Sequence, residues 1–132
     1  MTGARAMTGG GTVAIIVDDE PDMCWALGHI LKQSGIVRVT TTSGQEALRL
    51  VQRQHFDLAF IDAKLPDADG FELARRIREE NSEIPIVLVS GYFYGDDPDV
   101  LRALAAGIIS GFLSKPFLHG EVRAIARTLL AP

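Results

Sequence analysis

Short apolar runs and helix-like patterns alternate five times along this chain of 132 residues. The expected strands span residues 13–17, 37–41, 58–62, 86–90 and 108–113, because each is a short apolar or β-branched run. The second alternates with polar residues and is therefore expected nearer a sheet edge. This alternation predicts a doubly wound α/β fold, in which helices in right-handed crossovers cover both faces of a five-stranded parallel sheet.

Residues typical of helix ends mark where the connecting helices begin and end. Pro21 suits a first turn, Gly35 a C-terminal stop, Ser43-Gly-Gln-Glu46 a capping box and Asp69 an N-cap. The expected helices span about residues 21–34, 43–54, 69–80, 99–106 and 119–130. The third carries a run of charged residues that includes Arg78, and this run is expected to be a solvated face.

Composition narrows the function classes. With 47% hydrophobic and 23% charged residues and no apolar run of membrane-spanning length, the chain is expected to be soluble and not membrane-bound. The net charge of −4 and the absence of a dense basic run argue against direct nucleic-acid binding. The single Cys24 cannot form an internal disulfide, which fits a cytoplasmic location. Residues 1–11 are expected to form a flexible tail before one domain at 12–132.

Polar side chains of different chemistry stand at the ends of four expected strands. Asp18 and Asp19 follow the first, Asp62 ends the third, Ser90 ends the fourth, and Lys115 lies just beyond the fifth. The carboxyl ends of parallel strands meet at one edge, where open α/β sheets bind ligands, so these groups are expected to converge. The alternative for Asp62 alone is a carboxylate that merely caps the next turn.

Carboxylates brought together repel one another unless a cation neutralises them. Oxygen ligands with open positions suit Mg²⁺, or Mn²⁺, which is therefore the expected cofactor. A carboxylate such as Asp62 can also act as a nucleophile toward phosphorus, provided that a metal and a cation such as Lys115 meet the phosphoryl charge. The hydroxyl of Ser90 could donate to a phosphoryl oxygen and so sense the modification.

Four motifs, in this order and on these elements, resemble the receiver domain of bacterial two-component response regulators, the CheY-like family. The resemblance runs from Val13 to about Leu130, and the neighbourhood of Trp25 is loosely similar to NtrC-type receivers. It implies a flavodoxin-like (βα)5 fold with strand order 2-1-3-4-5. The motifs are Val17-Asp-Asp-Glu20, Asp62-Ala-Lys-Leu-Pro66 with Gly70, Ser90-Gly91 and Phe112-Leu-Ser-Lys-Pro-Phe117.

The resemblance implies a role for each residue of the site. Asp62 would be the phosphoacceptor, and Asp18, Asp19 and Asp62 would bind Mg²⁺ together with the backbone carbonyl of Lys64. Lys115 would pair with the phosphoryl group. These roles imply a signalling phosphoacceptor rather than an enzyme, one that catalyses only its own phosphorylation and dephosphorylation.

The resemblance also implies a conformational switch. Ser90 would bond the phosphoryl group, and Phe112, at a position where the family more often has tyrosine, would rotate inward. The face of the fourth helix, fifth strand and fifth helix would then change. The Lys115-Pro116 bond would be cis, as is typical of the family.

The partners implied are those of the family. A sensor histidine kinase or a phosphotransfer protein would supply the phosphoryl group. A downstream protein, or an output domain outside this sequence, would receive the signal. The switch face could also pair two copies of the chain as a homodimer.

Two other readings use the same residues. Enzymes of the haloacid-dehalogenase type also form an aspartyl phosphate at a strand end, but they carry a second Asp two residues after the nucleophile, where this chain has Lys64. A degenerate receiver that only binds partners would have lost an acidic or basic site residue. This chain retains Asp18, Asp19, Asp62, Ser90 and Lys115, so the phosphoacceptor reading is preferred.

Overall fold

The five strands form one parallel sheet in the order β2-β1-β3-β4-β5, as predicted. The structure, a computed structural model, describes residues 11–132, so the predicted tail lies outside the described residues except for Gly11. In chain order the elements are β1 (Val13–Val17), α2 (Pro21–Gln33), β2 (Val37–Thr41), α3 (Gly44–Arg53), β3 (Leu58–Asp62), α4 (Gly70–Glu80), β4 (Ile86–Ser90), α5 (Pro98–Ala105), β5 (Gly111–Ser114) and α6 (His119–Leu130).

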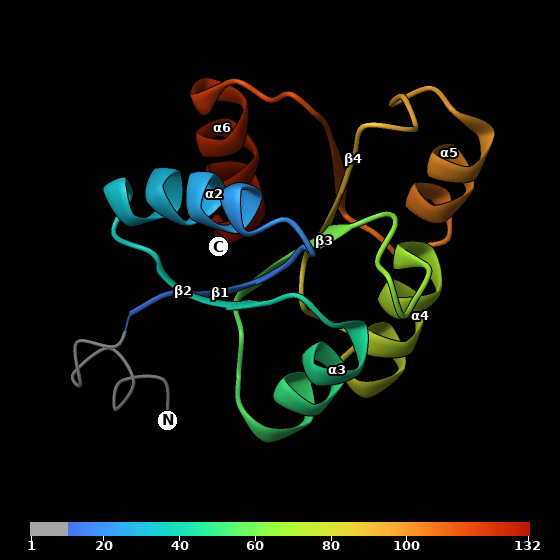
Figure 1. Cartoon of the computed structure of the whole chain (residues 1–132), viewed down its shortest axis with the longest axis horizontal. Coiled ribbons are helices and arrows are strands. Elements are labelled where there is room, and N and C mark those ends of the chain that lie inside the picture. Colours follow the sequence, from blue (N-terminus) through green and yellow to red (C-terminus); the bar gives the residue numbers. More distant parts are fainter. Residues whose placement is uncertain (1–10) are drawn as a thin grey trace.

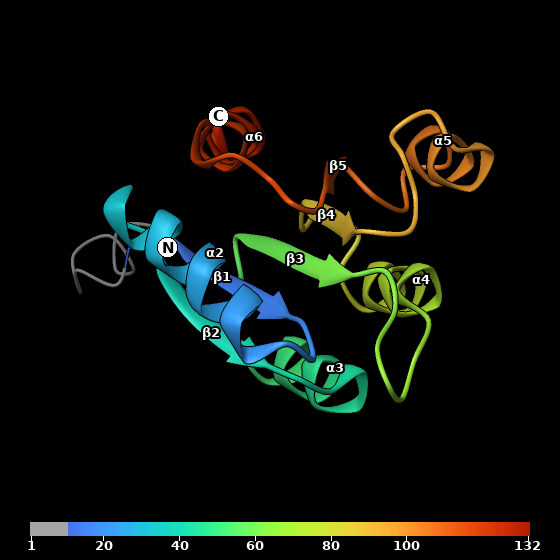
Figure 2. The same cartoon turned by 45° about the horizontal axis from the view of Figure 1, so that its top comes forward.

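Helices cover both faces of the sheet, α2 and α6 on one side and α3, α4 and α5 on the other (Figures 1 and 2). Every residue of β3 and β4 is buried, because apolar side chains on both faces of these central strands meet a helical layer. By contrast, β2 lies at the edge and exposes most of its residues, as its polar alternation predicted. The interior strands therefore carry the core and hold their carboxyl ends in a fixed register.

The helix ends follow the predicted chemistry in most places. Pro21 and Pro98 occupy the first turns of α2 and α5, where a missing N–H costs nothing. Gly35 and Gly107 follow the same helices with φ of 77° and 73°, a conformation that other residues rarely adopt. Asp69 caps α4 by accepting from the backbone N–H of Phe71 at 2.8 Å.

Two details differ from the sequence analysis. The last strand begins at Gly111 rather than near residue 108, because the N–H groups of Ile108 and Ile109 donate back to the carbonyl of Ala103 and complete the end of α5. The expected capping box at α3 is half formed. Ser43 accepts from the N–H of Glu46, but the Glu46 carboxylate accepts from the Thr41 hydroxyl instead.

Arg78 also departs from the expected solvated face. Its guanidinium donates to the carbonyl of Ile84 at 2.6 Å and to that of Ile108 at 3.1 Å, so it joins α4 to the loops at the amino ends of β4 and β5. The side chain is half-buried, and its Nε has no hydrogen-bond partner within residues 11–132. Arg78 is therefore a structural cross-link.

We expect Arg78→Met to lower the free energy of unfolding by about 2–3 kcal/mol, because two loop carbonyls lose a charged donor. Urea denaturation followed by circular dichroism measures the change. Arg76→Met, on the exposed part of the same helix, is the control and should change stability by no more than about 0.5 kcal/mol. Equal values for the two variants would contradict the cross-link.

Across residues 11–132, every helix falls short of the length and apolar character that crossing a membrane requires.

Candidate functional site

The polar residues predicted to converge do lie at the carboxyl edge of the sheet. Asp18 follows β1, Asp62 ends β3, and Ser90 ends β4, all three of them buried. Lys115 follows β5, and its backbone N–H donates to the carbonyl of Ser90 at 2.9 Å. The parallel register thus brings residues from four parts of the chain to one place.

The Lys115 ammonium lies among three carboxylates. Its Nζ is 3.0 Å from Asp18 Oδ2, 3.0 Å from Glu20 Oε1 and 3.5 Å from Asp62 Oδ2. The side chains of Lys115, Asp18 and Asp62 are only 13%, 2% and 7% exposed, whereas Glu20 is 61% exposed. The ion pairs with Asp18 and Asp62 are therefore shielded from water, and the one with Glu20 is open to solvent.

Burial and charge shift the proton affinities of this group. Burial first, and then the charge of Asp18, raise the pKa of Asp62 to about 6, although Lys115 opposes the shift. Burial alone would lower the pKa of Lys115, but its contacts with Asp18, Glu20 and Asp62 outweigh burial and raise that pKa. The site thus holds more negative charge than one ammonium balances.

The donor set fits a divalent cation. Asp18, Glu20 and Asp62 each offer a carboxylate oxygen, and these oxygens lie within 4.8 Å of one another. Asp18 Oδ2 is buried and pairs with the Lys115 ammonium at 3.0 Å, so this carboxylate already holds a cation that a metal ion could replace. Carboxylate oxygens suit Mg²⁺, which keeps several waters and supplies charge to neutralise phosphoryl oxygens. The predicted Mg²⁺ chemistry therefore fits these residues.

Asp19 and Glu20 are placed differently from the sequence expectation. Asp19 is exposed and lines the cavity at this edge, but it is outside the set of mutually close carboxylates. Glu20, which the sequence analysis gave no role, is within that set and contacts Lys115. The acidic run Val17-Asp-Asp-Glu20 was the available signal, but spacing could not tell which of its side chains contacts Lys115.

A cavity of about 440 Å³ opens at the site, lined by Asp19, Glu20, Asp62, Lys64, Gly91, Tyr92 and Lys115. The backbone N–H of Lys64 donates to Asp62 Oδ1 at 3.3 Å, which orients the carboxylate. The Lys64 ammonium lies 5.2 Å from the centre of the Tyr92 ring, a cation–π contact across the mouth. Lys64 and Tyr92 thus form part of the cavity wall beside Asp62.

The Ser90 hydroxyl oxygen is fully buried and accepts from the backbone N–H groups of Tyr92 at 2.9 Å and Phe93 at 3.2 Å. It therefore holds the start of the loop between β4 and α5. No described contact joins it to Asp62. Its proton remains available to a new acceptor, because both observed bonds use the oxygen as acceptor.

Phe112 lies on the α5 side of β5. It is half-buried against the core layer that contains Val100 and Ala103, two α5 residues. Gly95, in the loop between β4 and α5, lies beside the Phe112 ring. A Cβ added to Gly95 would be 3.9 Å from the ring. The nearby Lys115-Pro116 bond is cis.

Comparisons with known proteins agree with the geometry. The response regulator protein PilR of Pseudomonas aeruginosa is 33% identical over 117 residues, covering 89% of this chain and 26% of PilR. The response regulator protein TodT of Pseudomonas putida is 30% identical over 129 residues, covering 98% of this chain and 56% of TodT. The chain thus spans about a quarter of one relative and just over half of the other.

Solved structures agree as well. A two-component response regulator from Clostridium difficile superposes with a TM-score of 0.82 at 28% identity, covering 90% of this chain and 95% of that one. The receiver domain of a Pseudomonas aeruginosa sensor histidine kinase, with a magnesium ion coordinated in its active-site cleft, has a TM-score of 0.80 at 26% identity and covers 92% of this chain and 99% of its own.

A family model described as the response regulator receiver domain matches residues 14–127, a range that includes Asp18, Asp62, Ser90 and Lys115. The predicted resemblance is thereby confirmed. This chain belongs to the response regulator receiver domain family, whose members are phosphoacceptors of two-component signalling rather than conventional enzymes.

Proposed function

We propose that Asp62 accepts the phosphoryl group. The observation that carries this assignment is the 3.5 Å contact between Asp62 Oδ2 and the Lys115 ammonium at the floor of an open acidic cavity. In the reaction an Asp62 carboxylate oxygen attacks phosphorus and forms the new O–P bond. The bond from phosphorus to the donor breaks, and the donor atom keeps its electron pair. Lys115 would remain paired with the transferred group.

We propose that Asp18 and Asp62 hold Mg²⁺ with the backbone carbonyl of Lys64, and that Asp19 contributes after a rotation of its exposed side chain. The bound ion would neutralise charge on the phosphoryl oxygens. Glu20 could act in place of Asp19 or beside it, because its carboxylate already lies within the cluster. Mg²⁺ binding would also release Lys115 from Asp18, leaving its ammonium for the phosphoryl group.

We infer that the receiver unit spans residues 12–132 and works in the cytoplasm. A sensor histidine kinase or a phosphotransfer protein would donate the phosphoryl group. The output would be a downstream protein or a domain outside this sequence, and two copies could pair through α5, β5 and α6.

The test is phosphorylation by acetyl phosphate, a small donor that needs no partner protein. With Mg²⁺ present, intact-mass spectrometry should show one added phosphoryl group, and peptide mapping should place it on the segment that contains Asp62. Removing Mg²⁺ with a chelator should abolish uptake. Uptake on a different segment, or none under any condition, would overturn the assignment.

We also propose that Ser90 and Phe112 couple phosphorylation to the surface formed by α5, β5 and α6. A phosphoryl group on Asp62 would give the Ser90 hydroxyl a strong acceptor and draw the start of the β4–α5 loop inward. Because Phe112 packs beside that loop, it could then rotate into the space released. Such a switch shifts a population between two arrangements that already lie close in free energy.

We expect Ser90→Ala to keep phosphoryl acceptance but to show a much smaller response in α5, β5 and α6. Stability should fall by about 1–2 kcal/mol, because two backbone N–H groups lose their acceptor. Amide NMR shifts with and without beryllofluoride, a phosphoryl mimic, measure the response. Ser110→Ala is the matched control, since Ser110 accepts from the N–H of Ile86 at the opposite edge, and its response should be complete. A full response in Ser90→Ala would contradict the coupling.

A further inference from the structure

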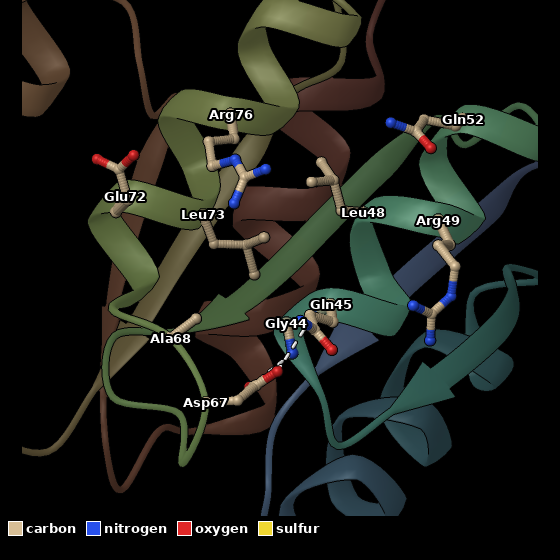
Figure 3. A pocket seen from close by; sticks show the side chains of 10 residues that line it. All are labelled: Gly44, Gln45, Leu48, Arg49, Gln52, Asp67, Ala68, Glu72, Leu73 and Arg76. Carbon is tan, nitrogen blue, oxygen red and sulfur yellow. Dashed lines mark hydrogen bonds between the residues drawn. The ribbon is translucent and has the colours of Figure 1, made fainter.

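The loop between β3 and α4, which follows Asp62, is fastened to the start of α3 by one side chain, Asp67. Its Oδ1 accepts from the backbone N–H of Gly44 at 3.0 Å, and its Oδ2 accepts from the N–H of Gln45 at 3.1 Å and from the Ser43 hydroxyl at 3.0 Å. Figure 3 shows this carboxylate reaching the α3 terminus at one end of the pocket between α3 and α4. Three bonds from one carboxylate thus join segments 22 to 24 residues apart in sequence.

This contact is additional to an ordinary helix cap. The N-terminal turn of α3 already has its own cap, because Ser43 Oγ accepts from the N–H of Glu46 at 3.2 Å. Asp67 serves the other free N–H groups of that turn, and these bonds lower the pKa of its carboxyl. The carboxylate therefore remains charged in the range in which Mg²⁺ would bind.

Close packing supports the same contact independently. A Cβ added to Gly44 would lie 2.9 Å from the Cβ of Ala68, so the helix start and the loop touch where Gly44 has no side chain. The joint therefore has a steric component as well as hydrogen bonds.

Hydrogen bonds within the β3–α4 loop connect Asp67 to the residues next to Asp62. The N–H of Leu65 donates to the carbonyl of Ala68 at 3.1 Å, and that of Gly70 donates to the carbonyl of Ala63 at 2.8 Å. Lys64 pairs with Asp69 in an antiparallel bridge, and its N–H holds Asp62 Oδ1. A shift at Asp67 would therefore move Lys64 and reorient the Asp62 carboxylate.

The segment before α3 reaches the other acidic loop. The carbonyl of Thr41 accepts from the N–H of Asp18 at 3.0 Å, and the Thr41 hydroxyl accepts from the N–H of Ser43 at 3.3 Å. Residues 41–45 thus contact the loop that carries Asp18 on one side and the loop that carries Asp62 and Lys64 on the other.

We propose that Asp67 is a positioning residue that sets the spacing of Asp18 and Asp62 by holding the β3–α4 loop against α3, and thereby tunes the affinity of the site for Mg²⁺. This inference rests on the proposed function, because it assumes that these carboxylates form the cation site. Asp67 itself lies outside the group of carboxylates close enough to share a cation.

The first measurement is Mg²⁺ affinity by isothermal titration calorimetry on the full chain. Asp67→Ala should weaken binding by about tenfold, the usual size of effect when a partner that orients metal ligands is lost. Asp67→Asn should bind with intermediate affinity, because its amide oxygen can still accept one of the N–H groups. Asn81→Ala is the matched control. Its side chain accepts from the N–H groups of Glu83 and Ile84 at the opposite edge of the sheet, and its affinity should stay within about twofold of the original.

The second measurement needs no metal. Amide hydrogen exchange without Mg²⁺ should be faster at Gly44, Gln45 and Leu65 in Asp67→Ala, and unchanged at these amides in Asn81→Ala. Unchanged Mg²⁺ affinity in Asp67→Ala, or unchanged exchange at Leu65, would overturn the inference. If Asp67→Ala does not fold, the comparison of Asp67→Asn with Asn81→Ala decides it.

The outcomes separate this inference from the proposed function. Failure of the original chain to bind Mg²⁺ would reject the cation site and the inference with it. Normal Mg²⁺ binding without phosphoryl uptake would reject the proposed function alone. Normal uptake with equal Mg²⁺ affinity in Asp67→Ala would reject the inference alone.

Discussion

Asp62→Asn is expected to abolish phosphoryl uptake from acetyl phosphate and, without Mg²⁺, to raise the free energy of unfolding at pH 7 by about 1–3 kcal/mol. The first effect follows because an amide oxygen is a poor nucleophile toward phosphorus. The second follows because the folded site resists ionisation of Asp62, whose pKa is raised from 3.8 to about 6. The site would thus gain stability while it loses its chemistry.

The sign of the pH dependence follows from the direction of this shift. Since the folded state holds the Asp62 proton more tightly than the unfolded chain, its stabilising contribution is complete below pH 3.8 and is lost as the pH rises through 6. In Asp62→Asn this loss between about pH 4 and 6 should disappear. Mg²⁺ should reverse the loss in the original chain, because a bound cation favours the ionised carboxylate.

Urea denaturation at several pH values, with and without Mg²⁺, measures these effects. Asp96→Asn in the exposed loop before α5 is the control and should change stability by no more than about 0.5 kcal/mol. Lower stability of Asp62→Asn at pH 7 without Mg²⁺ would contradict the electrostatic argument. Phosphoryl uptake equal to that of the original chain would contradict the assignment of Asp62.

Gly70→Ala is expected to destabilise the fold by about 3 kcal/mol or more, because the new methyl group would overlap backbone atoms. A Cβ at Gly70 would lie 2.3 Å from the carbonyl oxygen of Asp62 and 2.6 Å from the Cα of Ala63. Neither neighbour can rotate away, since both belong to the main chain at the end of a buried strand. Helix α4 would have to move away from β3 and take the loop after Asp62 with it.

The helical Gly120 of α6 is the matched control. A Cβ there would meet nothing within 4 Å, and its φ is not positive, so Gly120→Ala should be neutral or stabilising by up to about 1 kcal/mol. Thermal and urea unfolding measure both variants. Similar small effects of the two substitutions would show that α4 can move without cost.

The local chemistry of the chain was enough to predict the arrangement of the fold. Apolar runs, Pro21 at a helix start and Gly35 at a helix end depend on backbone sterics and on burial of neighbouring residues. Because strands and helices alternate, their carboxyl ends must meet at one edge, so the convergence of Asp18, Asp62 and Lys115 could be expected before any coordinates.

Contacts between distant segments depended on tertiary structure, since spacing along the chain does not fix how side chains turn. Sequence placed Arg78 on a charged helix face, but the loops beside α4 supply carbonyls that draw its guanidinium inward. Glu20 rather than Asp19 lies with the buried carboxylates, because the turn after β1 directs one side chain toward Lys115 and the other toward solvent.

The sequence by itself determined which elements form, their order along the chain and which chemical groups stand at the strand ends, because those features follow from local periodicity and backbone preference. The tertiary structure alone decided that Asp67 holds the start of α3 and that the site raises the pKa of Asp62. Both depend on how far apart segments lie in space and how well they exclude water, and neither quantity is encoded in residue spacing.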